Sequence, residues 1–347
     1  MFKVKKSGAK YSAIVGIGES LRQKSLDENK EYLFLNRGVN AVVNIDINEL
    51  AKGIDFNSDE IQVYPPVKGR PKLRAAINSA FFHNSASIDK IFITNGGVSA
   101  LDLIFKTLDV SEVVLPPLYW GAYLNVLKIN ALPFSFYASI SGLAENKDSL
   151  KGKAVIICDP NNPSGAKIED KILLETISKL DEAGVVVIVD SPYRRLFYDW
   201  GTDDYYKKLT EFEHVIVSES FSKSVGLSGQ RIGFVYCNNE DFMHELSIKL
   251  LYATNGINNF SQMLVEKILT EDIGIKAAKN FRKETVLAIE QNIDYLIENQ
   301  LIADKFYGEQ KPWGIFVIIK KTHEELLKNY IGSVPLTFFC QLDSVEA

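Results

Sequence analysis

Short apolar runs alternate with helical patterns through the middle of the chain. Several of these runs are nearly continuous in valine and isoleucine, as in residues 185–190, which is typical of strands buried on both faces of a sheet. Helical patterns such as 98–108 and 168–183 lie between several of them. The strand-like runs cover residues 90–94, 112–115, 131–136, 154–158, 185–190, 214–218 and 232–237. The alternation predicts an α/β fold with a mostly parallel seven-stranded sheet sandwiched by helices.

The pattern changes after Gly274. A long helix is expected over residues 275–299, followed by a short strand over 315–319, a helix over 323–329 and another short strand. We expect this tail to pack with the first forty or so residues. The sequence therefore predicts a large domain over 41–278 and a smaller α+β domain built from 1–40 plus 279–347, shortened at its C-terminus.

Composition and charge narrow the classes of partner. The 347 residues are 46% hydrophobic, and the net charge is −5 with both signs mixed. Because no long basic stripe and no run of about 18 apolar residues occurs, we expect neither a nucleic-acid partner nor a membrane partner. Three widely spaced cysteines fit reduced thiols in a cytoplasmic protein. Four scattered histidines give no support to a metal site, so none is expected.

Chemically capable residues follow the ends of several predicted strands, where open α/β sheets bind ligands. The segments are Asn95-Gly96-Gly97, residues 159–165, Asp190, and the stretch from Ser218 to Gly233. The last stretch sets Lys223 among small hydroxyl residues and glycines, with Arg231 eight positions later. Hydroxyls, glycine backbone and a guanidinium suit an anion such as phosphate, and the amine beside them suggests a lysine that forms a Schiff base.

Taken in this order, the motifs resemble those of the fold type I enzymes that use pyridoxal 5′-phosphate, in particular the class I/II aminotransferase family related to aspartate aminotransferase. They run from Tyr64 to Gly233, about half of the chain. In that family the pattern Ser-x-Ser-Lys-x-x-Gly-Leu-x-Gly-x-Arg-x-Gly carries the aldimine lysine, which here is Lys223. The resemblance implies the large-domain fold, pyridoxal phosphate as the cofactor, and Lys223, Asp190 and Tyr193 as catalytic residues.

The same resemblance implies the contacts of the cofactor. Asp190 matches the partner of the pyridinium nitrogen, Tyr193 and Asn162 match the donors to the phenolic oxygen, and Tyr119 looks like the aromatic residue that stacks on the ring, with Trp120 also open by spacing. The residues that match phosphate contacts are Ser220, Ser222, Arg231 and, through backbone amides, Gly97 and Val98.

Two further matches concern the neighbouring subunit and the substrate. Tyr64 is similar to a tyrosine that reaches the phosphate of the neighbouring subunit, so the resemblance implies a homodimer. Gly38 looks like the glycine whose backbone approaches the substrate carboxylate.

The chain departs from the family near its C-terminus. Members that act on amino acids usually carry an arginine there that pairs with the substrate α-carboxylate. Here the comparable stretch is Val334-Pro335-Leu336-Thr337-Phe338-Phe339, and the last arginine of the chain is Arg282. In one interpretation another arginine binds the carboxylate, and Arg37 is favoured for this over Arg194 and Arg195. Two alternatives stay open: an amine or modified amino acid as substrate, and substrate binding that is lost or supplied by a partner.

These features predict an aminotransferase that moves an amino group between an amino acid, or a related amine, and a 2-oxo acid. A decarboxylase, lyase or oxidase acting on an amino acid would use the same cofactor residues and stays open. A non-catalytic binding module with this fold is a further alternative, motivated by the missing arginine. A dinucleotide enzyme has less support, because the full spaced-glycine fingerprint is absent from the sequence.

Overall fold

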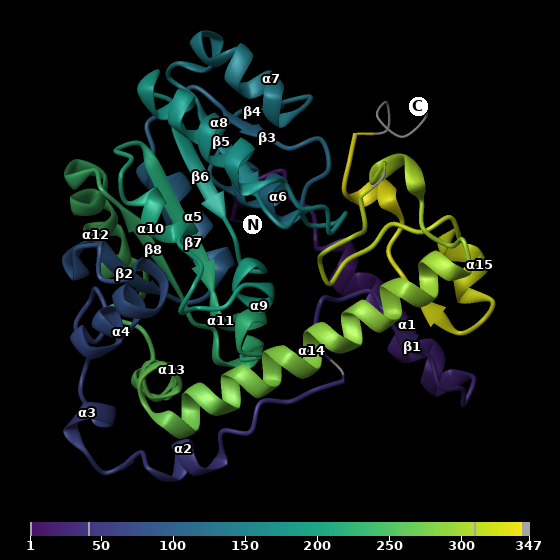
Figure 1. Ribbon diagram of the computed structural model, residues 1–347, viewed down its shortest axis with the longest axis horizontal. Coiled ribbons are helices and arrows are strands. Elements are labelled where there is room, and N and C mark those ends of the chain that lie inside the picture. The colour runs from purple at the N-terminus through teal and green to yellow at the C-terminus, as the bar shows by residue number, and fades with distance from the viewer. Residues whose placement is uncertain (1, 41, 309, 342–347) are drawn as a thin grey trace.

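The computed structural model describes residues 2–40, 42–308 and 310–341, and a seven-stranded sheet forms the centre of its larger part (Figure 1). The strand order is β2-β8-β7-β6-β5-β3-β4. The strands are β2 (Ile91–Thr94), β3 (Val113–Leu115), β4 (Phe134–Phe136), β5 (Ala154–Cys158), β6 (Val186–Asp190), β7 (Val215–Ser220) and β8 (Gly233–Cys237). Each lies within or next to a run that the sequence predicted, so the predicted seven-stranded sheet is confirmed.

Strand direction in the sheet is mostly parallel, as expected. The strands β4, β3, β5, β6 and β7 pair in parallel, whereas β8 runs antiparallel to both of its neighbours, β2 and β7. Every residue of β2, β5, β7 and β8 is buried. Full burial explains why these strands read as continuous apolar runs rather than as alternating ones.

Helices flank this sheet on both sides (Figure 1). The predicted helices over 98–108 and 168–183 are confirmed as α5 (Gly97–Thr107) and α8 (Asp170–Glu182). The other helices between residues 48 and 270 are α2 (Asn48–Lys52), α3 (Asp59–Gln62), α4 (Pro71–Phe82), α6 (Ala122–Ile129), α7 (Ile140–Glu145), α9 (Arg194–Phe197), α10 (Tyr205–Leu209), α11 (Phe221–Ser224), α12 (Glu240–Thr254) and α13 (Asn259–Thr270).

The N-terminal and C-terminal segments meet in a smaller part of the molecule. A two-stranded parallel sheet joins β1 (Leu33–Phe34) to β9 (Ile331–Gly332), beside α1 (Ala13–Asp27) and α15 (His323–Leu327). The 27-residue helix α14 (Asp272–Glu298) runs from the large sheet to this part (Figure 1). The expected packing of the two ends is therefore present. The domain limits at 41 and 278 stay a prediction, and residues 41, 309 and 342–347 lie outside the described residues.

The predicted strand over 315–319 is wrong. Within the described part of this segment only an antiparallel bridge forms, between Ile302 and Ile319. The backbone N–H of Ile318 donates instead to the hydroxyl of Tyr307, at 2.8 Å. Just before it, the N–H groups of Trp313 and Gly314 both donate to the carbonyl of Gly165. The backbone of this region thus bonds to the larger part of the molecule rather than to a neighbouring strand.

The described helices include none that is both long and apolar enough to cross a membrane.

Candidate active site

Three parallel strands bring the predicted site residues to one edge of the sheet. In the register of β5, β6 and β7, Cys158 pairs with Asp190 and Asp190 with Ser218. The three strands therefore end at nearly the same level. The loop with Asn162, the turn with Tyr193 and the short helix with Lys223 all begin there.

Lys223 lies on α11, directly after β7, and its amine donates to the carbonyl oxygen of Gly38. Burial lowers the pKa of this amine to about 8, and the positive charges of Arg231 and Arg37 act in the same direction. A substantial fraction of the amine is thus neutral near pH 8, and only the neutral amine can attack a carbonyl.

Asp190 ends β6 and is 4% exposed. Its Oδ2 accepts a hydrogen bond of 2.5 Å from the hydroxyl of Tyr123, on α6. Burial raises the pKa of the Asp190 carboxyl to about 6, and the bond from Tyr123 opposes this rise. Sequence reasoning missed Tyr123. The signal that could have found it is a tyrosine at the start of an amphipathic helix, one turn after the aromatic pair Tyr119-Trp120.

Asn162 and Tyr193 form a buried pair beside Asp190. The amide Nδ2 of Asn162 donates to the Tyr193 hydroxyl oxygen at 2.8 Å. Burial raises the pKa of the Tyr193 phenol well above its ordinary value, so the hydroxyl keeps its proton. No acceptor for that proton is found among the described residues. Tyr193 can therefore donate it to an oxygen of a bound molecule.

An anion cradle lies at the start of α5. Gly96 precedes the helix at φ +78°, and α5 has no side-chain cap, so its first amides remain open to a ligand. The guanidinium of Arg231 lies against Gly96, where an added Cβ would be 2.7 Å from Nη2. Gly96 must therefore be a glycine both for its backbone conformation and for the room that Arg231 takes.

Two hydroxyls border the same cradle. Ser220 and Ser222 share a hydrogen bond of 3.0 Å between their Oγ atoms. A Cβ on Gly97 would lie 3.7 Å from the Cβ of Ser220, which places the hydroxyl pair next to the helix start. Val98, the second residue of α5, is exposed, so only its backbone amide is available to the cradle. Helix amides, two hydroxyls and one guanidinium suit a phosphate dianion.

The rings of Tyr119 and Trp120 contact different residues. Tyr119 is 5% exposed, and its ring lies 5.2 Å from that of Phe136 on the edge strand β4. Trp120 is half-buried and meets the ring of Tyr123, the partner of Asp190, edge-on at 5.7 Å. Of the two rings, Trp120 therefore makes the contact closer to the predicted site.

The segment with Arg37 and Gly38 lies over Lys223. An added Cβ on Gly38 would be 2.6 Å from the ring of Phe316 and 3.0 Å from Ile315, so this residue must be a glycine. The Phe316 ring also meets Tyr193 edge-on, at 5.4 Å. Arg37 is exposed, and its charge acts on Lys223.

Arg194 and Arg195 do not reach the site as substrate residues. Arg194 is fully buried between the rings of Tyr198 and Tyr205 and forms paired hydrogen bonds of 2.6–2.9 Å with Asp170 and Asp203. Arg195 is equally buried and donates to backbone carbonyls of α4. The hypothesis that either one binds the substrate carboxylate is therefore wrong, because each guanidinium already has its partners inside the fold.

Tyr64 has no role within its own chain that the structure reveals. Its side chain is 81% exposed, at the surface end of the loop that leads into α4 (Pro71–Phe82). A tyrosine this exposed is available to a second subunit.

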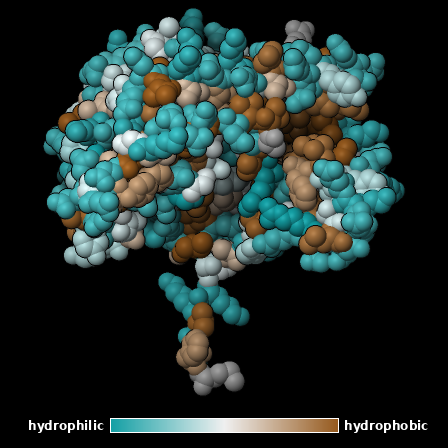
Figure 2. All heavy atoms as spheres, turned by 90° about the horizontal axis from the view of Figure 1, so that it is seen from below, coloured by the Kyte–Doolittle hydropathy of each residue, from teal (hydrophilic) through white to brown (hydrophobic). Residues whose placement is uncertain are grey.

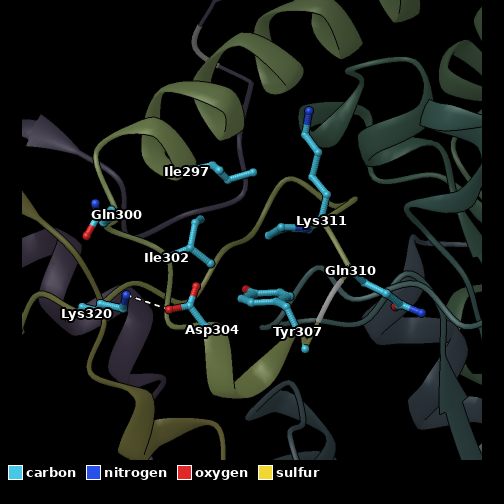
Figure 3. A pocket seen from close by; sticks show the side chains of 10 residues that line it. Ile297, Gln300, Ile302, Asp304, Tyr307, Gln310, Lys311 and Lys320 are labelled. Carbon is cyan, nitrogen blue, oxygen red and sulfur yellow. Dashed lines mark ion pairs between the residues drawn. The ribbon is translucent and has the colours of Figure 1, made fainter.

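The open cavity drawn in Figure 3 lies in the smaller part of the molecule. It has a volume of about 450 Å³ and is lined by Ile297, Ile302, Tyr307 and the ion pair of Asp304 with Lys320, among others. None of the predicted site residues lines it. Its link to the site is indirect, since the Tyr307 hydroxyl donates to the carbonyl of Ser164, two residues after Asn162.

Comparison with known proteins gives a family match and several relatives. The model described as aminotransferase class I and II matches residues 35–332. A histidinol-phosphate aminotransferase from Lactococcus lactis subsp. cremoris (strain MG1363) is 25% identical over 244 residues, which is 67% of this chain and 66% of that protein. An aspartate aminotransferase from Pyrococcus horikoshii is 27% identical over 238 residues, 64% of this chain and 59% of the relative. The matched part of the chain thus covers less than two thirds of each of these curated relatives.

Solved structures show the same fold. The aspartate aminotransferase from Thermus thermophilus with maleate has a TM-score of 0.83 at 20% identity and covers 98% of this chain and 93% of its own. A structure from Methanococcus jannaschii, described as similar in its active site to kynurenine aminotransferases, has a TM-score of 0.80 at 20% identity.

Proposed function

The chain belongs to the class I and II aminotransferase family, and from that premise we propose that it is a pyridoxal-phosphate-dependent aminotransferase with Lys223 as its reacting amine. The observation that carries the proposal is the Lys223 amine itself. It is partly buried and has a pKa lowered to about 8, beside a phosphate cradle and three groups suited to a pyridine ring and its phenolic oxygen.

The residues present fit the cofactor. Arg231, Ser220, Ser222 and the amides of Gly97 and Val98 would hold its phosphate, as the cradle beside Gly96 indicates. The free hydroxyl proton of Tyr193 and the Asn162 amide would face its phenolic oxygen. We assign the stacking contact to Trp120, because its ring meets Tyr123 whereas Tyr119 packs on Phe136.

Each protein group has a definable task. When bound, pyridoxal phosphate supplies an aldehyde for the amine and a ring that accepts electron density. Asp190, ionised above pH 6 and kept in place by Tyr123, would hold a proton on the ring nitrogen. Lys223, once free, would accept and return a proton at Nζ, for which a pKa near the working pH is favourable.

For the substrates we propose an amino donor and a 2-oxo acid, with Arg37 and the backbone of Gly38 beside the carboxylate. Of the three candidate arginines we propose Arg37, because Arg194 and Arg195 are hydrogen-bonded to partners inside the fold.

We also propose a homodimer in the cytoplasm. Tyr64 is 81% exposed, and the extended N-terminal residues, with Phe2 at 89% and Val4 at 70% exposure, leave the body of the subunit (Figure 2). Both features would be covered by a second copy. Cys158 and Cys237 are free, buried thiols, which fits a reducing compartment.

The test combines labelling with product analysis. Borohydride should fix the cofactor on Lys223 in the wild type, and the Lys223→Ala variant should give no reduced adduct; an adduct on another lysine contradicts the assignment. Incubation with a panel of amino donors should then convert the bound cofactor to pyridoxamine phosphate. Release of carbon dioxide, ammonia or an eliminated group without that conversion would favour a decarboxylase, oxidase or lyase instead.

A further inference from the structure

The guanidinium groups available to a substrate can be counted, because the sequence contains only eight arginines. Five of them, Arg70, Arg74, Arg194, Arg195 and Arg282, are bonded to carboxylates or backbone carbonyls of the fold. Arg22 is exposed on α1. Arg231 lies in the phosphate cradle. Arg37 is then the one arginine near Lys223 that has neither a protein partner among the described residues nor a task on the phosphate.

The surroundings of Arg37 hold no other charge in the sequence. It is the only charged residue between Glu31 and Asp46. Its neighbours Leu35 and Val39 are 60% and 54% exposed. Next to it, Gly38 accepts a hydrogen bond from the Lys223 amine. Arg37 thus offers a single cation within one residue of the reacting centre, with apolar neighbours along the chain and the hydrogen-bonded pair of Tyr11 and Glu19 close to its charge.

The wall facing this segment is also apolar. Ile315 and Phe316 reach the α-carbon of Gly38, and Phe316 continues the wall to the ring of Tyr193.

The loop that carries Tyr64 would not add a free cation from a second subunit. In this loop Arg70 is bonded to Glu60 and Glu266, at 3.4 and 3.1 Å. The amine of Lys68 lies over the ring of Phe92, 5.0 Å from its centre. Both charges are held within their own chain.

From these four observations we infer that the site selects substrates with a single anionic group, bound by Arg37, and an uncharged, apolar remainder. The inference deepens the proposed function and rests on it. The α-carboxylate would use Arg37. A second carboxylate, as in glutamate or aspartate, would enter an apolar surrounding without a counter-charge, and an unpaired charge is strongly disfavoured there.

The test uses donors of equal shape. Norvaline and glutamate differ only in that a methyl group replaces the distal carboxylate, and n-butylamine is norvaline without its carboxylate. The second-order rate constant for forming pyridoxamine phosphate should be larger for norvaline than for glutamate by about tenfold or more. This is the factor expected for one uncompensated charge. Equal or faster reaction of glutamate would overturn the inference. If the reduced Lys223 adduct forms but no donor in a wide panel reacts, the proposed function fails instead.

Binding without chemistry gives a second measurement. In calorimetric titrations of the cofactor-loaded protein, valerate should bind more tightly than glutarate, which has the same length but two carboxylates. Tighter binding of glutarate would contradict the single-anion site.

A variant separates the charge of Arg37 from its other effects. In Arg37→Met the reaction of norvaline should fall by about a hundredfold, as expected for loss of a charge-assisted contact, whereas that of n-butylamine should change by less than about threefold. The comparison within one protein cancels any change in the basicity of Lys223. Equal losses for both donors would show that Arg37 does not bind the carboxylate. The surface variant Arg22→Met is the matched control and should leave both rates unchanged.

Discussion

At the scale of single residues, the main constraint on the site is the charge state of its buried groups. In the proposed mechanism Asp190 must stay ionised although burial raises the pKa of its carboxyl to about 6, and the hydrogen bond from Tyr123 opposes that rise. Gly38 shows the opposite kind of constraint, because its missing side chain makes room for Phe316. Neither Tyr123 nor Phe316 was among the site residues inferred from sequence.

Removing the Tyr123 hydroxyl should therefore change a pH profile. In Tyr123→Phe the ionised form of Asp190 loses a donor, so its pKa rises above about 6. As the pH falls, Asp190 is then protonated at a higher pH than in the wild type. The acidic limb of turnover against pH should therefore move to higher pH by about one unit. Turnover well above pH 8 should change less.

Tyr205→Phe supplies the control for this measurement. Tyr205 is also buried, but its hydroxyl has no hydrogen-bond partner in the described structure. The acidic limb should stay in place in this variant. A shift of the same size in both variants would assign the effect to packing rather than to Asp190.

At the scale of elements, an internal ion network ties the loops of the site together. Asp159, at the end of β5, pairs with Lys167 at 2.8 Å, and both Lys167 and Arg194 bind Asp170 at the start of α8. Arg194 follows Tyr193 directly, and Asp159 lies three residues before Asn162. The network thus fixes the two segments that carry Asn162 and Tyr193, the proposed donors to the phenolic oxygen.

Cutting this network should cost stability. Arg194→Met leaves Asp170 and Asp203 without their main counter-charge, and removal of one member of a buried ion pair typically lowers the free energy of unfolding by about 3–5 kcal/mol. Urea unfolding of the two proteins measures the difference.

Arg74→Met is the matched control, since Arg74 pairs with the largely exposed Asp89 and one backbone carbonyl. It should cost about 1 kcal/mol. A loss in Arg194→Met no larger than this would mean that the network contributes little to the fold.

At the scale of the whole molecule, the site is assembled from distant parts of the chain. The N-terminal segment contributes Arg37 and Gly38, β6 contributes Asp190, α11 contributes Lys223, and the C-terminal part contributes Phe316. The exposed Tyr64 would add a residue from a second subunit.

Mixing two defective subunits tests that last contribution. A heterodimer of Lys223→Ala with Tyr64→Ala would hold one site with an intact Lys223 and an intact Tyr64 donated by the other chain. At limiting cofactor we expect it to recover about half of the wild-type activity, because one of its two sites is complete. If Tyr64 serves its own chain, neither site is complete and activity should not recover. Sedimentation of the wild type checks the dimer directly.

Much of the fold and the cofactor half of the site could be predicted from sequence. The buried strands are continuous apolar runs, and the residues that follow them carry a motif around Lys223 whose chemistry is local. The predicted strand over 315–319 was wrong, because it was also inferred from an apolar pattern. That pattern suits a strand, but the backbone of this region bonds to the Gly165 loop and to Tyr307. Apolar pattern reports burial, and it does not report which backbone group is the partner.

The sequence by itself thus determined the sheet and predicted Lys223 as the reacting lysine together with the residues expected around the cofactor, because those depend on periodicity and on short motifs. The tertiary structure decided what becomes of the arginines. Arg194 and Arg195 looked equivalent to Arg37 along the chain, yet folding surrounds the first two with carboxylates, carbonyls and rings and leaves Arg37 beside Lys223. A charge is available to a substrate only where folding supplies no other partner, and that depends on contacts between residues far apart in sequence.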